Sequence, residues 1–202
     1  MRNRKELLEF LSEIKNYYLG YNKDLENDFK WKLPTLLEDL RDGNIEKDAV
    51  YTAIHIFGEA RYKEAEIEIV KYLDNEDSEL RKIALNVLGV HWNSKEYLQI
   101  YESVLLDKKE DEDNRSMAAS CISSIFIGTK NKKYLNLLIS LFMDKNESWY
   151  IKDSAYFSII CIWGIPPQNW PSFAKKLDYK KDIDWNLIEE IEKYVSVKKL
   201  LV

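Results

Sequence analysis

The sequence predicts an all-α chain built as an α-solenoid, in which pairs of helices are stacked on one another. Apolar residues recur at helical spacing from end to end of the 202 residues. Four apolar segments end in a glycine, at positions 58, 89, 128 and 164. A repeat of between about 30 and 40 residues that holds two helices is typical of stacked helical repeats.

A single domain is predicted, with the repeats in residues 45–165 between two helical caps. The N-terminal cap, residues 1–43, holds one helix that Gly20 ends and a second from about Asp24 to Leu40. Pro34 predicts a kink or break in the second helix, because proline lacks the N–H that a helix interior needs.

The C-terminal cap, residues 166–202, begins within a segment rich in tryptophan and proline, "WGIPPQNWP" at 163–171. Such a segment can cover the apolar end of a repeat stack. Exposed tryptophans beside prolines also make binding hot spots, so both interpretations stay open and the cap is favoured. A final helix over residues 185–195 has apolar residues along one side and is expected to close the stack.

Each repeat is predicted to consist of a first helix, a turn with glycine, a second helix and an acidic loop. The four glycines are predicted to end the first helices in the left-handed conformation. Small residues five positions before the first three glycines, Ala53, Ala84 and Ser123, are expected to let neighbouring helices approach closely. Asp77 or Ser78 is expected to cap one first helix by accepting a hydrogen bond from an unpaired N–H.

Second helices are predicted over residues 62–73, 94–106 and 131–143. Within the first of these, "AEIEIV" at 65–70 alternates as a strand does, so a β-hairpin is the alternative. A helix is favoured, because the flanking apolar residues keep helical spacing.

The segment "DNEDSELRKIALNVLG" at 74–89 has an acidic loop followed by Leu80, Arg81, Ala84, Leu88 and Gly89. This arrangement resembles the HEAT repeat family. The match is partial around the glycines at 58 and 128, where no arginine occupies the corresponding place, and weak around the glycine at 164. The resemblance covers roughly residues 45–165. It implies a right-handed curved stack whose second helices line the concave side, and a binding scaffold with no particular activity.

The composition argues against nucleic-acid and membrane partners. The net charge is −5, and only six of the thirty basic residues are arginine, the side chain suited to bidentate phosphate recognition. No segment approaches the roughly 18 apolar residues of a membrane span, and glutamates interrupt the basic N-terminal segment, so no signal peptide is expected. Cys121 and Cys161 are expected to be buried thiols in a reducing compartment. A soluble cytoplasmic protein is therefore expected.

The solvent-facing positions of the three second helices align in rows when the repeats are superimposed. These rows are polar and mixed in charge, which suits a protein or peptide partner better than a polyanion. A merely solvated helix face is the alternative for any single residue. The candidate partner-binding residues on these helices are Lys71, Gln99, Ser103, Asn136 and Ser140.

Three consecutive loops between repeats are acidic, which predicts a negative rim along one edge of the stack. The loop "DKKEDED" at 107–113 adds Glu110, Asp111 and Asp113 to the candidate partner-binding residues. A negative rim would speed association with a cationic partner. The favoured interpretation of this loop alone is that it solubilises the chain.

No arrangement of residues for catalysis or metal binding is visible. His55 is interpreted as a half-buried structural residue, and His91 as a turn residue packed on Trp92. Two histidines and two cysteines without close spacing make a zinc site improbable, and no metal or cofactor is expected. There is no nucleophile elbow or glycine-rich phosphate loop. Carboxylates in solvated loops lack the environment that perturbs the pKa of a catalytic acid.

The leading hypothesis is a non-enzymatic protein-binding module that uses the concave face and the acidic rim. A concrete form of it is an immunity or antitoxin-like protein of a bacterium, because such proteins tend to be small, acidic and without catalytic motifs. The alternative is an enzyme of the HEAT-like DNA glycosylase type acting on alkylated DNA, which the negative charge and low arginine content disfavour. A bilin lyase-like protein ranks last, because no tetrapyrrole pocket is identified.

Overall fold

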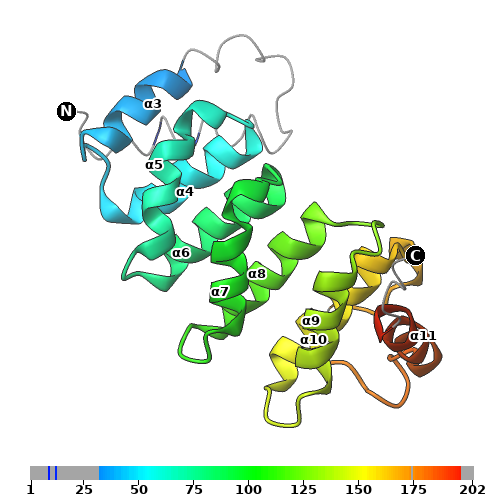
Figure 1. Ribbon diagram of the computed structural model, residues 1–202. Helices are drawn as coiled ribbons and strands as arrows, with labels where there is room; N and C mark the ends of the chain where they lie inside the picture. The colour runs from blue at the N-terminus through cyan, green and yellow to red at the C-terminus, as the bar shows by residue number, and fades with distance from the viewer. Residues whose placement is uncertain (1–8, 10–11, 13–31, 174, 197–202) are drawn as a thin grey trace. The chain divides into compact units, whose positions relative to one another are not determined.

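The computed structural model describes residues 9, 12, 32–173 and 175–196, and every regular element among them is helical (Figure 1). The all-α prediction is confirmed for this part of the chain, and the strand alternative at 65–70 is wrong. Apart from Glu9 and Ser12, the helix predicted before Gly20 lies outside the described residues. None of the described helices is both long enough and apolar enough to cross a membrane.

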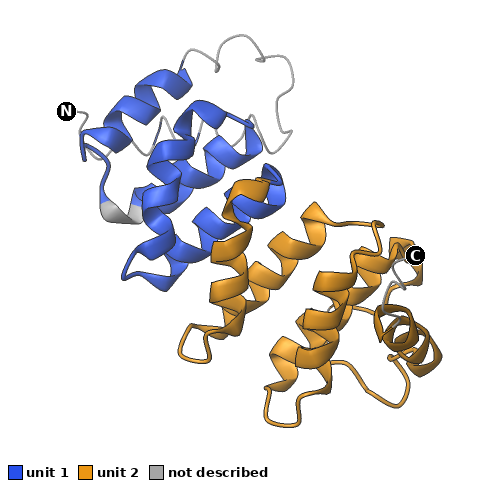
Figure 2. Cartoon of the chain, viewed as in Figure 1, with its two compact units in different colours: residues 1–93 blue, residues 94–202 orange. Residues whose placement is uncertain are grey.

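The chain forms two compact units, unit 1 (residues 1–93) and unit 2 (residues 94–202) (Figure 2). The described helices of unit 1 are α3 (Lys32–Arg41), α4 (Lys47–Glu59), η2 (Lys63–Ala65), α5 (Glu66–Val70), η3 (Lys71–Asp74), α6 (Ser78–Leu85) and the π-helix η4 (Asn86–His91). Those of unit 2 are η5 (Lys95–Tyr97), α7 (Leu98–Leu106), α8 (Glu112–Ile125), α9 (Lys132–Met143), α10 (Trp149–Trp163), η6 (Pro167–Asn169) and α11 (Trp185–Ser196).

In unit 1, α4 is the central element, because it packs against α3, α6 and η4. Ala53 of α4 and Ala84 of α6 are fully buried. The burial of both small side chains, on helices that pack together, fits the close helix approach that the sequence predicts.

The break predicted at Pro34 is wrong, because α3 runs without interruption through this residue, and the kink stays a prediction. Pro34 is the third residue of the described part of α3, which begins at Lys32. The part of the predicted helix before Lys32 lies outside the described residues.

Gly58 does not end its helix, contrary to the prediction, because α4 continues to Glu59 and Arg61 takes the left-handed position instead (φ 50°). The Arg61 N–H donates to the Gly58 carbonyl, and the Tyr62 N–H donates to the Phe57 carbonyl, both at 3.0 Å. Gly58 has another role, since a Cβ placed there would lie 2.6 Å from Cγ2 of Val87. The glycine therefore lets η4 approach α4 closely.

Gly89 also departs from the prediction, since it is buried inside the π-helix η4. The wide turns of η4 end with the Trp92 N–H donating to the Val87 carbonyl at 3.0 Å, five residues back. The prediction holds for Gly164, which has φ 92° at the end of α10 and whose successor Ile165 donates to the Ile160 carbonyl at 2.9 Å.

Unit 2 contains two successive helix pairs and a final helix. Helix α7 packs on α8, α9 packs on α10, and α8 packs on α10. Ser123 of α8 is buried, and its carbonyl accepts a hydrogen bond from the Cys161 thiol of α10 at 3.6 Å. The predicted last helix is confirmed as α11, which packs on α9.

The helix starts repeat more regularly than the helix ends. Asp77 caps α6 by accepting from the Glu79 N–H at 3.0 Å, as predicted, and Asp111 caps α8 in the same way, from the Asp113 N–H at 2.9 Å. Each cap is followed four residues later by an arginine, Arg81 or Arg115.

Both arginines also bond to the backbone that precedes their helix. Nη1 of Arg81 donates to the Asn75 carbonyl at 2.6 Å, and Nε of Arg115 donates to the Leu105 carbonyl at 3.0 Å. When the repeats are aligned at their glycines, no arginine near Gly128 corresponds to Arg81. When α6 and α8 are instead aligned at their first residues, Arg115 corresponds to Arg81.

Candidate functional site

The five candidate residues on the second helices are all exposed, as the helical spacing predicts. They fall in both units: Lys71 begins η3 in unit 1, and the other four lie on α7 and α9 in unit 2. Nζ of Lys71 pairs with the largely buried carboxylate of Glu68 at 2.6 Å, a contact that holds the Lys71 side chain along the helix. In unit 2 the exposed candidates are Gln99, Ser103, Asn136 and Ser140.

Helices α7 and α9 are joined by Glu102, which lies among the exposed candidates of α7. Its Oε1 accepts hydrogen bonds from Nζ of Lys133 at 2.6 Å and from the Tyr134 hydroxyl at 2.7 Å. Burial raises the pKa of Glu102, but these two hydrogen bonds and the positive charge of Lys133 together lower it by more, so the pKa lies below its ordinary value. The ionised carboxylate of Glu102 thus links α7 to α9. The exposed candidate residues of unit 2 therefore lie on two helices that this contact joins. We call these four residues, Gln99, Ser103, Asn136 and Ser140, the α7–α9 face.

The acidic residues of the predicted loop 107–113, whose last two residues form the start of α8, have structural partners besides solvent. Asp111 caps α8, and Oε1 of Glu110 accepts from the Asp111 N–H and from the Asn114 amide, both at 2.9 Å. Asp113 accepts a hydrogen bond from the Tyr150 hydroxyl at 2.9 Å. The loop is therefore ordered by its own carboxylates, while Asp111 and Asp113 stay exposed. A docking role for these residues stays a prediction.

The tryptophan-rich segment at 163–171 is packed at both ends. Trp163 is buried, and the indole N–H of Trp170 donates to the Ile165 carbonyl at 2.7 Å. Two aromatic residues outside the segment are more accessible: Trp149 is 47% exposed and Phe173 is 65% exposed. Exposed apolar side chains of this kind are the ones that binding hot spots use, and Phe173 is not among the binding residues that the sequence predicts.

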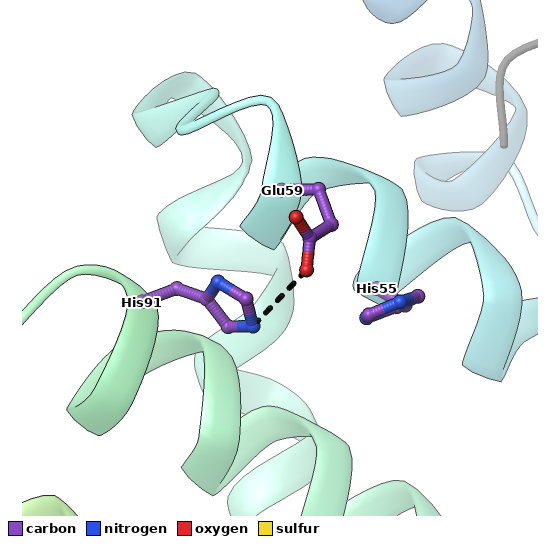
Figure 3. Close-up of side chains that lie close together, drawn as sticks. All are labelled: His55, Glu59 and His91. Atoms are coloured by element: carbon purple, nitrogen blue, oxygen red, sulfur yellow. Dashed lines mark ion pairs between the residues drawn. The ribbon is translucent and has the colours of Figure 1, made fainter. Parts of the chain in front are cut away.

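The structure brings together two histidines that are far apart in the sequence. His55, Glu59 and His91 each offer one atom that could bind a metal ion, and these three atoms all lie within 4.8 Å of one another (Figure 3). Nε2 of His91 lies 3.7 Å from Oε1 of Glu59. His55 and Glu59 project from one helix, α4, and His91 comes from the neighbouring η4. We call this group the His–Glu–His cluster.

The local sequence explains how the cluster forms. His55 and Glu59 are four residues apart, which places them on the same face of α4. His91 is the last residue of the π-helix η4, so its interpretation as a turn residue is wrong. Because Gly58 has no side chain, η4 lies close enough to α4 for the His91 ring to approach Glu59.

The cluster is partly accessible. The His91 side chain is 23% exposed and the Glu59 side chain is 33% exposed. The rings of His55 and His91 meet edge to face, with their centroids 6.2 Å apart, and Nδ2 of Asn86 lies 3.4 Å from Nε2 of His91. Two sequence signals point to the cluster. His55 and Glu59 are four residues apart, and the segments around Gly58 and Gly89, which pack together as α4 and η4, are predicted to be equivalent first helices.

Comparisons with protein-family models, with curated proteins and with solved structures found no match for this chain.

Proposed function

We propose that the chain is a non-enzymatic protein-binding module made of HEAT-like repeats in a right-handed solenoid. Its partner binds the exposed faces of the second helices, flanked by the acidic loops. The observation that carries the proposal is the α7–α9 face: successive second helices, linked through Glu102, expose polar residues at equivalent positions.

The recurrence of one helix-start arrangement supports the repeat architecture. In α6 and in α8 an aspartate caps the helix, and an arginine four residues later bonds to a carbonyl of the preceding segment. A repeated set of contacts at repeated positions is what a stack of equivalent helix pairs requires.

The chemistry of the surface favours a protein partner with a basic region. The α7–α9 face contains amides and hydroxyls, which form hydrogen bonds to many kinds of peptide group. The exposed carboxylates of Asp111 and Asp113 add negative charge, which accelerates association with a cationic protein. The concrete form of the proposal is an immunity or antitoxin-like protein of the bacterial cytoplasm, which binds a basic toxin.

The proposal is tested by comparing what the wild-type chain and two variants capture from a lysate of the native organism. Ser103→Arg with Ser140→Arg places two bulky cations on the α7–α9 face. Gln168→Arg with Asn169→Arg adds the same charge at two exposed positions of η6 and serves as the matched control. Far-ultraviolet circular dichroism checks that both variants keep the helical fold.

We expect the wild-type chain and the η6 control to capture the same partner, and the α7–α9 variant to lose it. Raising the salt concentration should also slow association, because the acidic loops act through screened charges. Equal capture by both variants would place the binding surface elsewhere.

A further inference from the structure

We propose that the His–Glu–His cluster binds a divalent transition-metal ion of the Zn²⁺ class. This site is separate from the α7–α9 face and does not depend on the proposed binding function. Its three donors come from two neighbouring elements of unit 1, so a bound ion would join α4 to η4.

The geometry is close to that of a metal site. Two ligand atoms bound at about 2.0–2.1 Å from one tetrahedral ion lie about 3.3 Å apart. The Glu59 oxygen and the His91 nitrogen are separated by 3.7 Å, and no pair in the cluster exceeds 4.8 Å. Side-chain rotations alone can therefore bring the donors to the ion, without a change in the backbone.

The backbone around the cluster is built in an uncommon way. A π-helix is rare and occurs frequently at functional sites. Here the π-helix ends at His91, and the absence of a side chain at Gly58 allows it to approach the helix of the other two donors. Val87, which Gly58 accommodates, is fully buried, so this approach is fixed by the core. The backbone positions of the three donor residues are therefore set before an ion binds, and only their side chains need to rotate.

The donor set selects the kind of ion. Imidazole nitrogen suits Zn²⁺, Cu²⁺, Ni²⁺ and Fe²⁺, whereas Mg²⁺ and Ca²⁺ prefer six or more oxygen ligands. Two histidines and one carboxylate leave a fourth position of a tetrahedral ion open. Because Glu59 and His91 are partly exposed, water or an acceptor group of another molecule can reach that position.

The contact with Asn86 is compatible with this role. In the tautomer whose proton is on Nδ1, Nε2 of His91 can accept a hydrogen bond from the Asn86 amide nitrogen through its lone pair. A lone pair on Nε2 is also what a metal ion needs. The ion would replace Asn86 as the partner of Nε2.

The experiment uses the full-length chain without an affinity tag, freed of metal by a chelator. Zn²⁺ is titrated calorimetrically, and Co²⁺ is used as a spectroscopic probe whose visible absorption reports its ligands and their number. The variants are His55→Gln, Glu59→Gln and His91→Gln. Glu76→Gln removes an exposed carboxylate of the same unit outside the cluster and is the matched control.

We expect one Zn²⁺ per chain and a higher melting temperature with Zn²⁺, because an ion that binds only the folded state stabilises it. Each cluster variant should bind at least about tenfold more weakly and lose the Zn²⁺-dependent rise, while the control keeps both. Glu59→Gln is nearly isosteric and partly exposed, so it keeps the test valid if a histidine variant fails to fold.

The proposal is wrong if Zn²⁺ binds with the same affinity to His91→Gln and the wild type, or if no saturable binding occurs. It is also wrong if bound Co²⁺ shows thiolate charge-transfer absorption, since that would place the ion on a cysteine. The folded chain disfavours this outcome, because both thiols are buried and burial raises the pKa of Cys121 and Cys161.

Discussion

Arg115 and Glu147 form a bidentate ion pair inside unit 2. Nη1 and Nη2 of the arginine donate to the two carboxylate oxygens at 3.0 and 2.7 Å, and each side chain is only 4% exposed. The arginine belongs to α8, and the glutamate lies just before the N-cap of α10, so the pair joins two successive first helices. With its third bond to the Leu105 carbonyl, Arg115 also holds the end of α7.

Removing the charge of Glu147 should therefore destabilise unit 2 strongly. Glu147→Gln leaves a buried guanidinium without its counter-charge, which costs about 3–5 kcal/mol in free energy of unfolding. The measurement is urea unfolding followed by circular dichroism. Glu189→Gln, at an exposed position of α11, is the control and should change the free energy by less than about 0.5 kcal/mol. A change as small as that of the control would show that the pair is not maintained in solution.

The same pair predicts the response of the protein to acid. The hydrogen bonds from Arg115 hold the pKa of Glu147 below its ordinary value. A carboxyl whose pKa is depressed by folding stabilises the native state above its unfolded pKa of about 4.3. This stabilisation is lost as the pH falls through the lower folded pKa. The difference in unfolding free energy between wild type and Glu147→Gln should be constant near neutral pH and shrink below about pH 4. A difference that does not change down to pH 3 would contradict this origin.

Gly58→Ala tests the close approach of α4 and η4. The added Cβ would lie 2.6 Å from Cγ2 of the buried Val87, so we expect a loss of roughly 1–3 kcal/mol in unfolding free energy. Val87→Ala creates space opposite the new methyl group, so the double variant should be less destabilised than the sum of the two single variants. Additive effects in thermal or urea unfolding would show that the two residues are not in contact.

Asp111 allows the capping role of the acidic loop to be separated from its charge. Asp111→Ala removes the cap of α8 and should cost about 1 kcal/mol, whereas Asp111→Asn keeps an oxygen acceptor and should cost little. Chemical denaturation of both variants measures the difference. Equal destabilisation would mean that the charge, and not the cap, is what stabilises the helix. Asp111→Asn is therefore the better variant for testing whether the negative charge attracts a partner.

Local signals in the sequence predicted much of the fold. Helical spacing of apolar residues identified the described second helices and the exposure of Gln99 and Asn136, because burial follows directly from position around a helix. Asp77 and Gly164 were predicted correctly, since caps depend on residues within one turn. The binding role of the exposed residues stays a prediction.

Features that depend on packing between distant segments were not predictable in this way. Whether a glycine ends a helix or accommodates a neighbour is decided by what lies opposite, and Val87 opposite Gly58 is not evident from either local sequence. The proximity of His55 and His91 depends on the same contact and on the π-helix that precedes Trp92. An alignment of the repeats at their glycines does not match Arg115 with Arg81, because Gly89 lies inside η4 whereas Gly128 follows α8. The two helices match at their starts.

The most direct test of the proposed binding function is photo-crosslinking in the native organism. A photoreactive amino acid is placed singly at Ser103 or Ser140 on the α7–α9 face, and at Gln168 or Asn169 on η6 as controls. We predict that both positions of the face yield a crosslink to the same protein and that the η6 positions yield none. Crosslinks from η6 alone, or none from the face, would contradict the proposal that a partner binds on α7 and α9.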